Sequence, residues 1–152
     1  MATNPSLSFQ IRRLLFVAIL LSICVLVVYW IVQQNKPWVV PAEYKALKNP
    51  LLPTQLNLEA AKQIYTEQCA QCHGERGQGD GPEARTHYPL PADLTDANRM
   101  ANIVDGEIFY QISEGRRPMP SFKQRLTQDQ LWQLVHYVRS FSQALPKPAD
   151  QE

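Results

Sequence analysis

The hydrophobic positions of the chain form one long uninterrupted run, followed by several short amphipathic segments. The run covers residues 14–32, nineteen residues without a charged side chain. At about 1.5 Å per residue, a helix of this length crosses most of the hydrocarbon core of a bilayer, which is about 30 Å thick. The run therefore predicts a membrane-spanning helix or a signal sequence.

The residues within the run favour an anchor that stays on the protein. A cleaved signal has a shorter apolar core followed by a small-residue cleavage site, whereas this run ends with Tyr29 and Trp30, aromatic residues that suit a membrane interface. Lipid attachment at Cys24 is the alternative, but the bulky Ile23 stands where such a site needs a small residue. We therefore interpret Cys24 as a packing or lipid-facing residue.

The charges that flank the run predict its orientation. Arg12 and Arg13 precede it directly, and Lys36 is the one cation close behind it. The positive-inside rule then predicts a cytoplasmic segment at residues 1–13, a single-pass anchor at 14–32, and an outer location for all that follows.

Residues 33–57 predict a tether or a segment that wraps around a domain. Fully extended, these 25 residues reach about 75 Å at about 3.1 Å each, far enough for a small domain to swing between two partners. Trp38 and Tyr44 favour packing instead, because a free linker has little use for such side chains. The sequence leaves both interpretations open. The prolines that favour extended chain are Pro37, Pro41, Pro50 and Pro53.

Helical periodicity in residues 58–141 predicts one all-α domain. A helix is expected at 58–72 with Asn57 as its N-cap, and another at 106–114, capped by Asp105 and ended by Gly115. The clearest begins at Thr127, which forms a capping box with Gln130. No segment alternates as a strand would, and the polar tail at 142–152 is expected to be flexible. The apolar stripe of the last helix contains Leu131, Leu134, Val135, Val138 and Phe141.

Composition suits one small domain with appendages. The chain has 152 residues, 45% of them hydrophobic, and a formal net charge of +1 from 15 lysine and arginine against 14 aspartate and glutamate residues. It has no basic excess of the kind that nucleic-acid binding requires, so no nucleic-acid partner is expected.

The strongest chemical signal is the segment Cys69-Ala70-Gln71-Cys72-His73. Cys-x-x-Cys-His is the pattern by which haem is attached covalently, because both thiols can add to the vinyl groups of one porphyrin while the histidine lies under the iron. A zinc site would need more ligands, and His87 and His136 lie far away in the sequence. A thioredoxin-like dithiol would need a βαβ pattern, which is absent around the motif. The prediction is one covalently bound haem c.

The order of further motifs resembles the class I monohaem cytochromes c, in their membrane-anchored bacterial form. The resemblance covers residues 58–141 and implies an all-α class I cytochrome c domain behind an N-terminal transmembrane helix. The segments that carry it are 69–74, 79–82, 91–95, 105–109, 118–122 and the helix with Leu131, Trp132 and Tyr137.

The resemblance implies roles for several residues. Met119, between Pro118 and Pro120, would be the sixth iron ligand opposite His73, with Met100 as its rival. The carbonyl of Pro82 would accept the Nδ1 proton of His73. Aromatic side chains of the first and last helices, Tyr65 and Tyr137, would cross near the haem, beside Ala61. Candidates for holding a haem propionate are Arg99, Arg116 and Tyr88, and the cations around Met119 that could meet an acidic partner are Arg116, Arg117, Lys123 and Arg125.

An iron with both axial positions filled can only exchange electrons, so we expect an electron carrier with no catalytic residues. The resemblance implies transfer from a quinol-oxidising membrane complex to a terminal acceptor, such as an oxidase or a reaction centre, on the periplasmic side of the membrane. The segment 49–53 looks most like the monohaem subunit of alternative complex III, whereas anchored subunits of nitric oxide reductase match the motifs less well. The alternatives are a haem enzyme or gas sensor with an open iron site, and a structural subunit whose haem is incidental.

Overall fold

The structure, a computed structural model, describes residues 5–34 and 38–142. The chain divides after Trp38 into two units, an N-terminal helix and a compact helical domain. The predicted tail at 142–152 lies outside the described residues except for Ser142.

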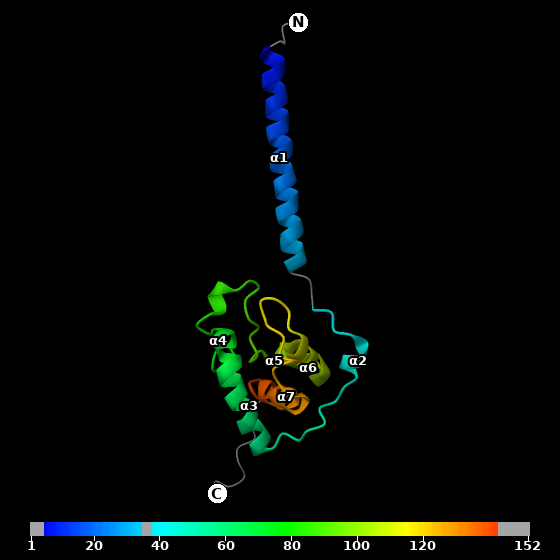
Figure 1. Cartoon of the computed structure of the whole chain (residues 1–152), viewed down its shortest axis with the longest axis vertical. Coiled ribbons are helices and arrows are strands. Elements are labelled where there is room, and N and C mark those ends of the chain that lie inside the picture. The colour runs from blue at the N-terminus through cyan, green and yellow to red at the C-terminus, as the bar shows by residue number, and fades with distance from the viewer. Residues whose placement is uncertain (1–4, 35–37, 143–152) are drawn as a thin grey trace. The chain divides into compact units, whose positions relative to one another are not determined.

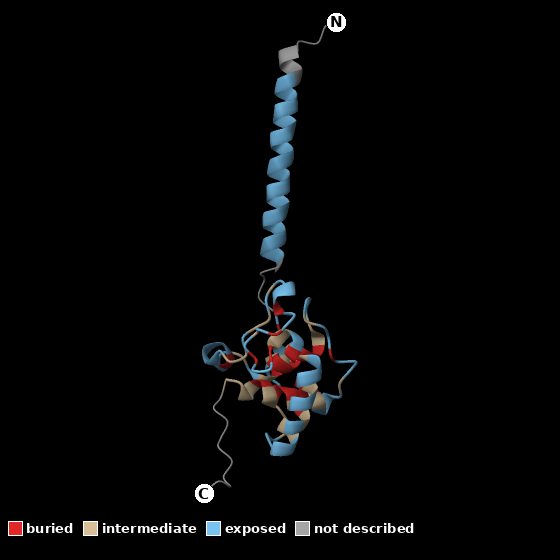
Figure 2. Ribbon diagram, turned by 90° about the vertical axis from the view of Figure 1, so that its left-hand side faces the viewer, coloured by how far each residue is buried: buried red, intermediate tan, exposed pale blue. Residues whose placement is uncertain are grey.

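The N-terminal unit is a single long helix, α1 (Pro5–Gln34). It begins before the apolar run and so includes part of the segment predicted to be cytoplasmic. The most apolar 18-residue stretch within Phe9–Gln33 has a mean hydropathy of 3.0, and Figure 2 colours the described ribbon of this helix as exposed. Of the described helices, α1 alone is long and apolar enough to cross a membrane, a property that anchors and signal sequences share.

Three helices frame the domain, and the remaining elements are short (Figure 1). The helix α3 (Gln55–Gln68) packs along α7 (Gln128–Ser140), and α6 (Asp105–Glu114) packs against α7 from another side. Within the described residues there is no strand, only an isolated bridge between Arg116 and Met119. The all-α prediction is confirmed. The short elements are α2 (Ala42–Lys45), α4 (Ala70–His73), the 3-10 helix η1 (Ala84–Thr86) and α5 (Ala97–Ala101).

Local hydrogen bonds explain where the main helices begin. The capping box predicted for α7 is present: the Gln130 amide donates to Thr127 Oγ1 over 3.2 Å, and the Thr127 amide donates to Gln130 Oε1 over 2.8 Å. The predicted cap of α3 was wrong, because Thr54, not Asn57, precedes its first turn and accepts the Asn57 amide over 3.3 Å. Similarly, α6 begins one residue before its predicted start. Its N-cap is Val104, not Asp105, because the Glu107 carboxylate accepts the Val104 amide.

The core lies between α3, α6 and α7. Ala61 and Tyr65 are buried where α3 packs on α7, and the Tyr65 ring lies 5.2 Å from that of Tyr137 between centroids. The predicted aromatic pair is therefore present. From the other side, the Phe109 ring stacks on Trp132 at 4.2 Å. Burying these large rings supplies much of the hydrophobic stabilisation of so small a domain.

Residues 39–54, called the strap below, pack on the domain. Val40 is buried, and the ring of Tyr44 lies 4.7 Å from that of Tyr110. Further along, Asn49 donates a hydrogen bond to the carbonyl of Trp132 over 3.0 Å. The wrapping interpretation is therefore correct for the strap, and the compact unit begins at Val39 rather than at residue 58.

Candidate functional site

The Cys-x-x-Cys-His motif forms a separate helical turn at the end of α3. The amide of Cys69 still donates to Tyr65 O over 2.8 Å, but its backbone then departs from the helix (φ −119°, ψ −35°), and α4 begins after it. The amide of His73 donates to Cys69 O over 2.9 Å, which closes the turn. This single turn brings Cys69, Cys72 and His73 together, as the motif predicts.

A glycine-rich loop folds back against this turn. The amide of Gly79 donates to His73 O over 2.8 Å, and the amide of Gly81 donates to Cys72 O over 3.2 Å. A Cβ atom on Gly81 would lie 2.3 Å from Gln71 O, so only glycine allows this approach. The segment 79–82, which carried part of the resemblance, therefore fixes the backbone of α4.

A backbone carbonyl farther along the chain orients His73. Its Nδ1 lies 3.2 Å from Ala92 O and donates to it, because a carbonyl can only accept. The predicted acceptor was Pro82, and the structure corrects this: the chain turns back after η1 and brings Ala92, not Pro82, to the ring. With Nδ1 protonated, the lone pair lies on Nε2, the atom available to a metal.

Burial lowers the pKa of His73, and the charge of Arg99 lowers it further, while the hydrogen bond to Ala92 acts in the opposite direction. The imidazole is consequently neutral near pH 7, and a neutral imidazole is the form that binds metal.

Both thiols of the motif favour the protonated form. Burial, and next the nearby Cys72, raise the pKa of Cys69 to about 12, and burial followed by Glu83 raises the pKa of Cys72. Redox-active dithiols need the opposite shift, since the thiolate is the reactive species. The environment therefore argues against a thioredoxin-like function.

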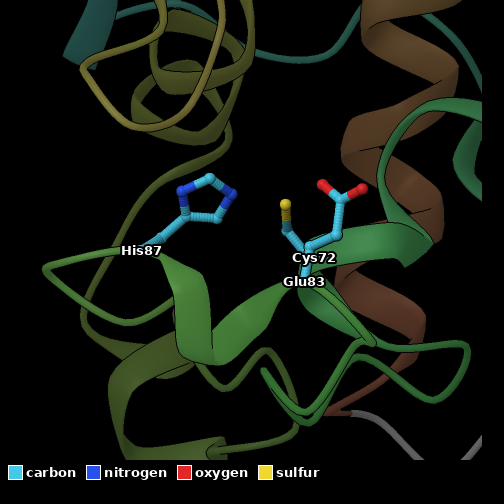
Figure 3. Close-up of side chains that lie close together, drawn as sticks. All are labelled: Cys72, Glu83 and His87. Carbon is cyan, nitrogen blue, oxygen red and sulfur yellow. The ribbon is translucent and has the colours of Figure 1, made fainter.

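A second group of donor atoms, which the sequence did not reveal, adjoins the motif. Ligand atoms of Cys72, Glu83 and His87 all lie within 4.8 Å of one another (Figure 3). His87 is distant in sequence, but η1 turns it back toward Cys72. The group includes neither Cys69 nor His73, so it does not explain the motif as a zinc site.

Met119 lies in a loop that is tied to α6. The Met119 amide donates to Arg116 O within the loop over 2.8 Å. A bond to α6 is made by Ser121 Oγ, which donates to Ser113 O over 2.7 Å. Met119 is partly exposed and packs against the edge of the core, whereas the rival Met100 is 2% exposed inside it. The structure thus keeps Met119 accessible and commits Met100 to packing.

The cations predicted around Met119 are partly engaged by the domain itself. Lys123 Nζ lies 2.7 Å from a Glu114 carboxylate oxygen, and the Arg125 guanidinium lies 6.0 Å from the centroid of the Phe122 ring. The backbone of Arg116, and not its guanidinium, pairs with Met119 in the isolated bridge. Of the propionate candidates, the charge of Arg99 acts on His73.

Comparison with known proteins now identifies the family. The family described as cytochrome c oxidase, cbb3-type, subunit III matches residues 56–138, more than half of the chain. The chain belongs to the class I cytochromes c. The matched residues include the attachment motif, the Met119 loop and nearly all of α3 and α7.

Individual relatives agree with this assignment. Cytochrome c6 of Pyropia tenera is 30% identical over 87 residues, which cover 57% of this chain and 95% of the relative. Cytochrome c6 of Rippkaea orientalis is 35% identical over 85 residues, covering 56% and 71%. Among solved structures, a chain of the Kuenenia stuttgartiensis reducing HAO-like protein complex matches with a TM-score of 0.55 and 33% identity, over 71% of this chain and about half (51%) of that one.

Membership implies a covalently bound haem c, and the residues of this cytochrome fit that group. Cys69 and Cys72 lie in the positions of the attachment motif, and neither is engaged in a disulfide. The Nδ1 of His73 is occupied by Ala92 O, which leaves Nε2 available. The donor set therefore suits two thioether bonds and one axial nitrogen.

Proposed function

We propose that this cytochrome is a membrane-anchored carrier of single electrons, with His73 and Met119 as the axial ligands of one haem c. The observation that carries the proposal is the orientation of His73 by Ala92 O at 3.2 Å, next to the two attachment thiols. A histidine held in this tautomer is a preorganised iron ligand.

Met119 is proposed as the second axial ligand on three grounds. It is accessible, its loop is fixed to α6 by backbone and side-chain hydrogen bonds, and Met100 is committed to the core. When bound, a haem with histidine and methionine ligands supplies reversible one-electron chemistry at a raised potential. Cys69, Cys72, His73 and Met119 would hold the group and would leave the iron no position for a substrate, which supports a carrier and not an enzyme.

The proposed anchor is α1, kept uncleaved in the cell membrane with the haem domain on the periplasmic side. Its apolar stretch Phe9–Gln33 is long enough to span a bilayer, and the aromatic residues Tyr29 and Trp30 lie near its C-terminal end. Arg12 and Arg13 lie toward the opposite end, as the positive-inside rule requires of a cytoplasmic N-terminus.

The proposed partners are a quinol-oxidising membrane complex as donor and a terminal oxidase or reaction centre as acceptor. Two observations support this choice: the matching family is described as an oxidase subunit, and the haem domain follows an apolar helix in the same chain. A subunit of a respiratory or photosynthetic complex, in contact with membrane lipid, accounts for both.

The axial ligand is tested by spectroscopy of the purified holoprotein. The oxidised protein should show the weak long-wavelength band that arises from a methionine sulfur bound to ferric haem. Met119→Leu should abolish the band and lower the reduction potential, whereas Met100→Leu, the matched control, should keep both. A high-spin spectrum in the unaltered protein, or loss of the band only in Met100→Leu, would refute the proposal and favour an open iron site.

A further inference from the structure

Whether the strap is docked or free affects how this cytochrome reaches its partners, because the strap lies in the chain between α1 and the haem domain. If it were free, the domain could swing on a long tether. The structure instead gives it contacts with α6 and with α7, each of which can be followed residue by residue.

The contact with α6 is close. A Cβ atom on Gly106 would lie 1.8 Å from Tyr44 O, so the backbones of strap and helix meet with no space for a side chain. The ring of Tyr44 packs on Tyr110, and Lys45 Nζ lies 3.2 Å from a Glu107 carboxylate oxygen. Backbone contact, ring packing and an ion pair thus hold the same turn of the strap.

The contact with α7 consists of specific hydrogen bonds. Asn49 Nδ2 donates to Trp132 O over 3.0 Å, while Asn49 Oδ1 accepts the amide of Leu51 over 3.0 Å. His136 Nε2 donates to Leu51 O over 2.8 Å. Each bond is partly buried, and a partly buried bond of this kind contributes about 1 kcal/mol to stability.

With the strap packed, little chain is left to act as a tether. Between the α-carbons of Gln34, the last residue of α1, and Val39, the first of the strap, lie five virtual bonds. At about 3.8 Å each, they reach at most about 19 Å whatever their conformation. This is a quarter of the span of about 75 Å that a free segment 33–57 would have.

We infer that the cytochrome domain is a fixed relay that serves one membrane-embedded partner and not a shuttle that swings between two distant ones. The inference rests on the proposed function and specifies its partner: an integral-membrane electron-transfer protein whose cofactor opens at the outer face, within reach of a link of about 19 Å. Of that partner and a diffusing carrier, one gives the electron to the haem domain and the other takes it. With α1 held beside that partner, a site much farther away than the link and the domain together span is beyond reach.

The experiment lengthens the link without touching the strap. Fourteen glycine and serine residues are inserted after Lys36 in the full-length, membrane-bound holoprotein, and the same linker after Ser142 is the control. Electron delivery from quinol to the terminal acceptor is measured in native membranes. Because a longer flexible link lowers the effective concentration of the docked domain, the fixed relay predicts a loss of several-fold or more after Lys36 and none after Ser142. An equal or faster rate after Lys36 would establish a shuttle and overturn the inference.

Hydrogen exchange of the same holoprotein tests the strap independently of any partner. The amides of Tyr44, Lys45 and Leu47 donate hydrogen bonds within the strap. These amides should be protected from exchange, because so short a turn keeps its hydrogen bonds only while the strap is docked. Exchange at free-chain rates would overturn the inference. Haem that stays unreduced by quinol in the unaltered membranes would instead contradict the proposed function, while the exchange pattern still decides whether the strap is docked.

Discussion

Removing one hydroxyl group from the centre of the domain tests how the attachment turn is held. Tyr65 is 1% exposed, and its hydroxyl donates to Gly74 O over 2.8 Å, directly after His73. The Gly74 carbonyl also accepts the amide of Gly77 over 3.1 Å, so Tyr65→Phe leaves no buried acceptor without a partner. The expected loss is therefore about 1 kcal/mol, the net value of one hydrogen bond, and not the larger cost of an orphaned carbonyl.

The assay is thermal unfolding of the holoprotein, in which about 1 kcal/mol lowers the Tm of a domain of this size by roughly 4–8 °C. Tyr137→Phe is the matched control: its ring packs 5.2 Å from that of Tyr65, but within the described residues its hydroxyl makes no hydrogen bond. That variant should unfold almost as the unaltered protein does. Equal Tm values for the two variants would refute the reasoning, because ring packing alone would then explain the role of Tyr65.

The pH dependence of the same variant provides a second check. Burial raises the pKa of Tyr65 above its ordinary value of 10.0. A folded state that holds this proton more tightly than the unfolded state loses stability as the pH rises above the unfolded pKa. The unaltered protein should therefore be destabilised in alkali above about pH 10, and Tyr65→Phe should show a smaller alkaline loss.

Two further predictions concern the backbone around the site and the end of α7. Gly81→Ala should lower haem loading and cost more than about 2 kcal/mol of folding free energy, because its Cβ would lie 2.3 Å from Gln71 O. The control Pro82→Ala, at an exposed residue, should leave haem loading and stability unchanged, and a comparable loss in the control would contradict this reasoning. Arg139→Gln should cost at least about 2 kcal/mol in denaturant unfolding, since the half-buried guanidinium bonds to a carboxylate and two carbonyls. Lys123→Gln, at an exposed ion pair, should leave the unfolding midpoint unchanged, and an equal loss in both variants would refute the argument.

The parts of the fold that the sequence predicted are those determined by neighbouring residues. The capping box at Thr127 and the glycine that ends α6 at Gly115 act within one turn, so their signals are local. The attachment turn is equally local, because Cys69, Cys72 and His73 share one helical turn.

The parts that the sequence missed depend on distant segments. Ala92 reaches His73 only because the intervening loop folds back, and nothing at residue 92 marks its carbonyl as an acceptor. The proximity of Glu83 and His87 to Cys72 has the same origin, a turn through η1 that is too short to leave a periodic pattern. The strap was undecided because prolines suit free and docked chain equally, and only its fit against Gly106 distinguishes the two.

The docked strap also changes where a soluble fragment of this protein should be cut. The family match begins at residue 56, which would place the cut after the strap and expose the ring faces of Phe109 and Tyr110 on which Tyr44 packs. A fragment beginning at Val39 keeps these faces sealed and omits the apolar helix. That longer fragment is the better choice for crystallisation and voltammetry, because the uncovered aromatic surface of the shorter one would promote aggregation.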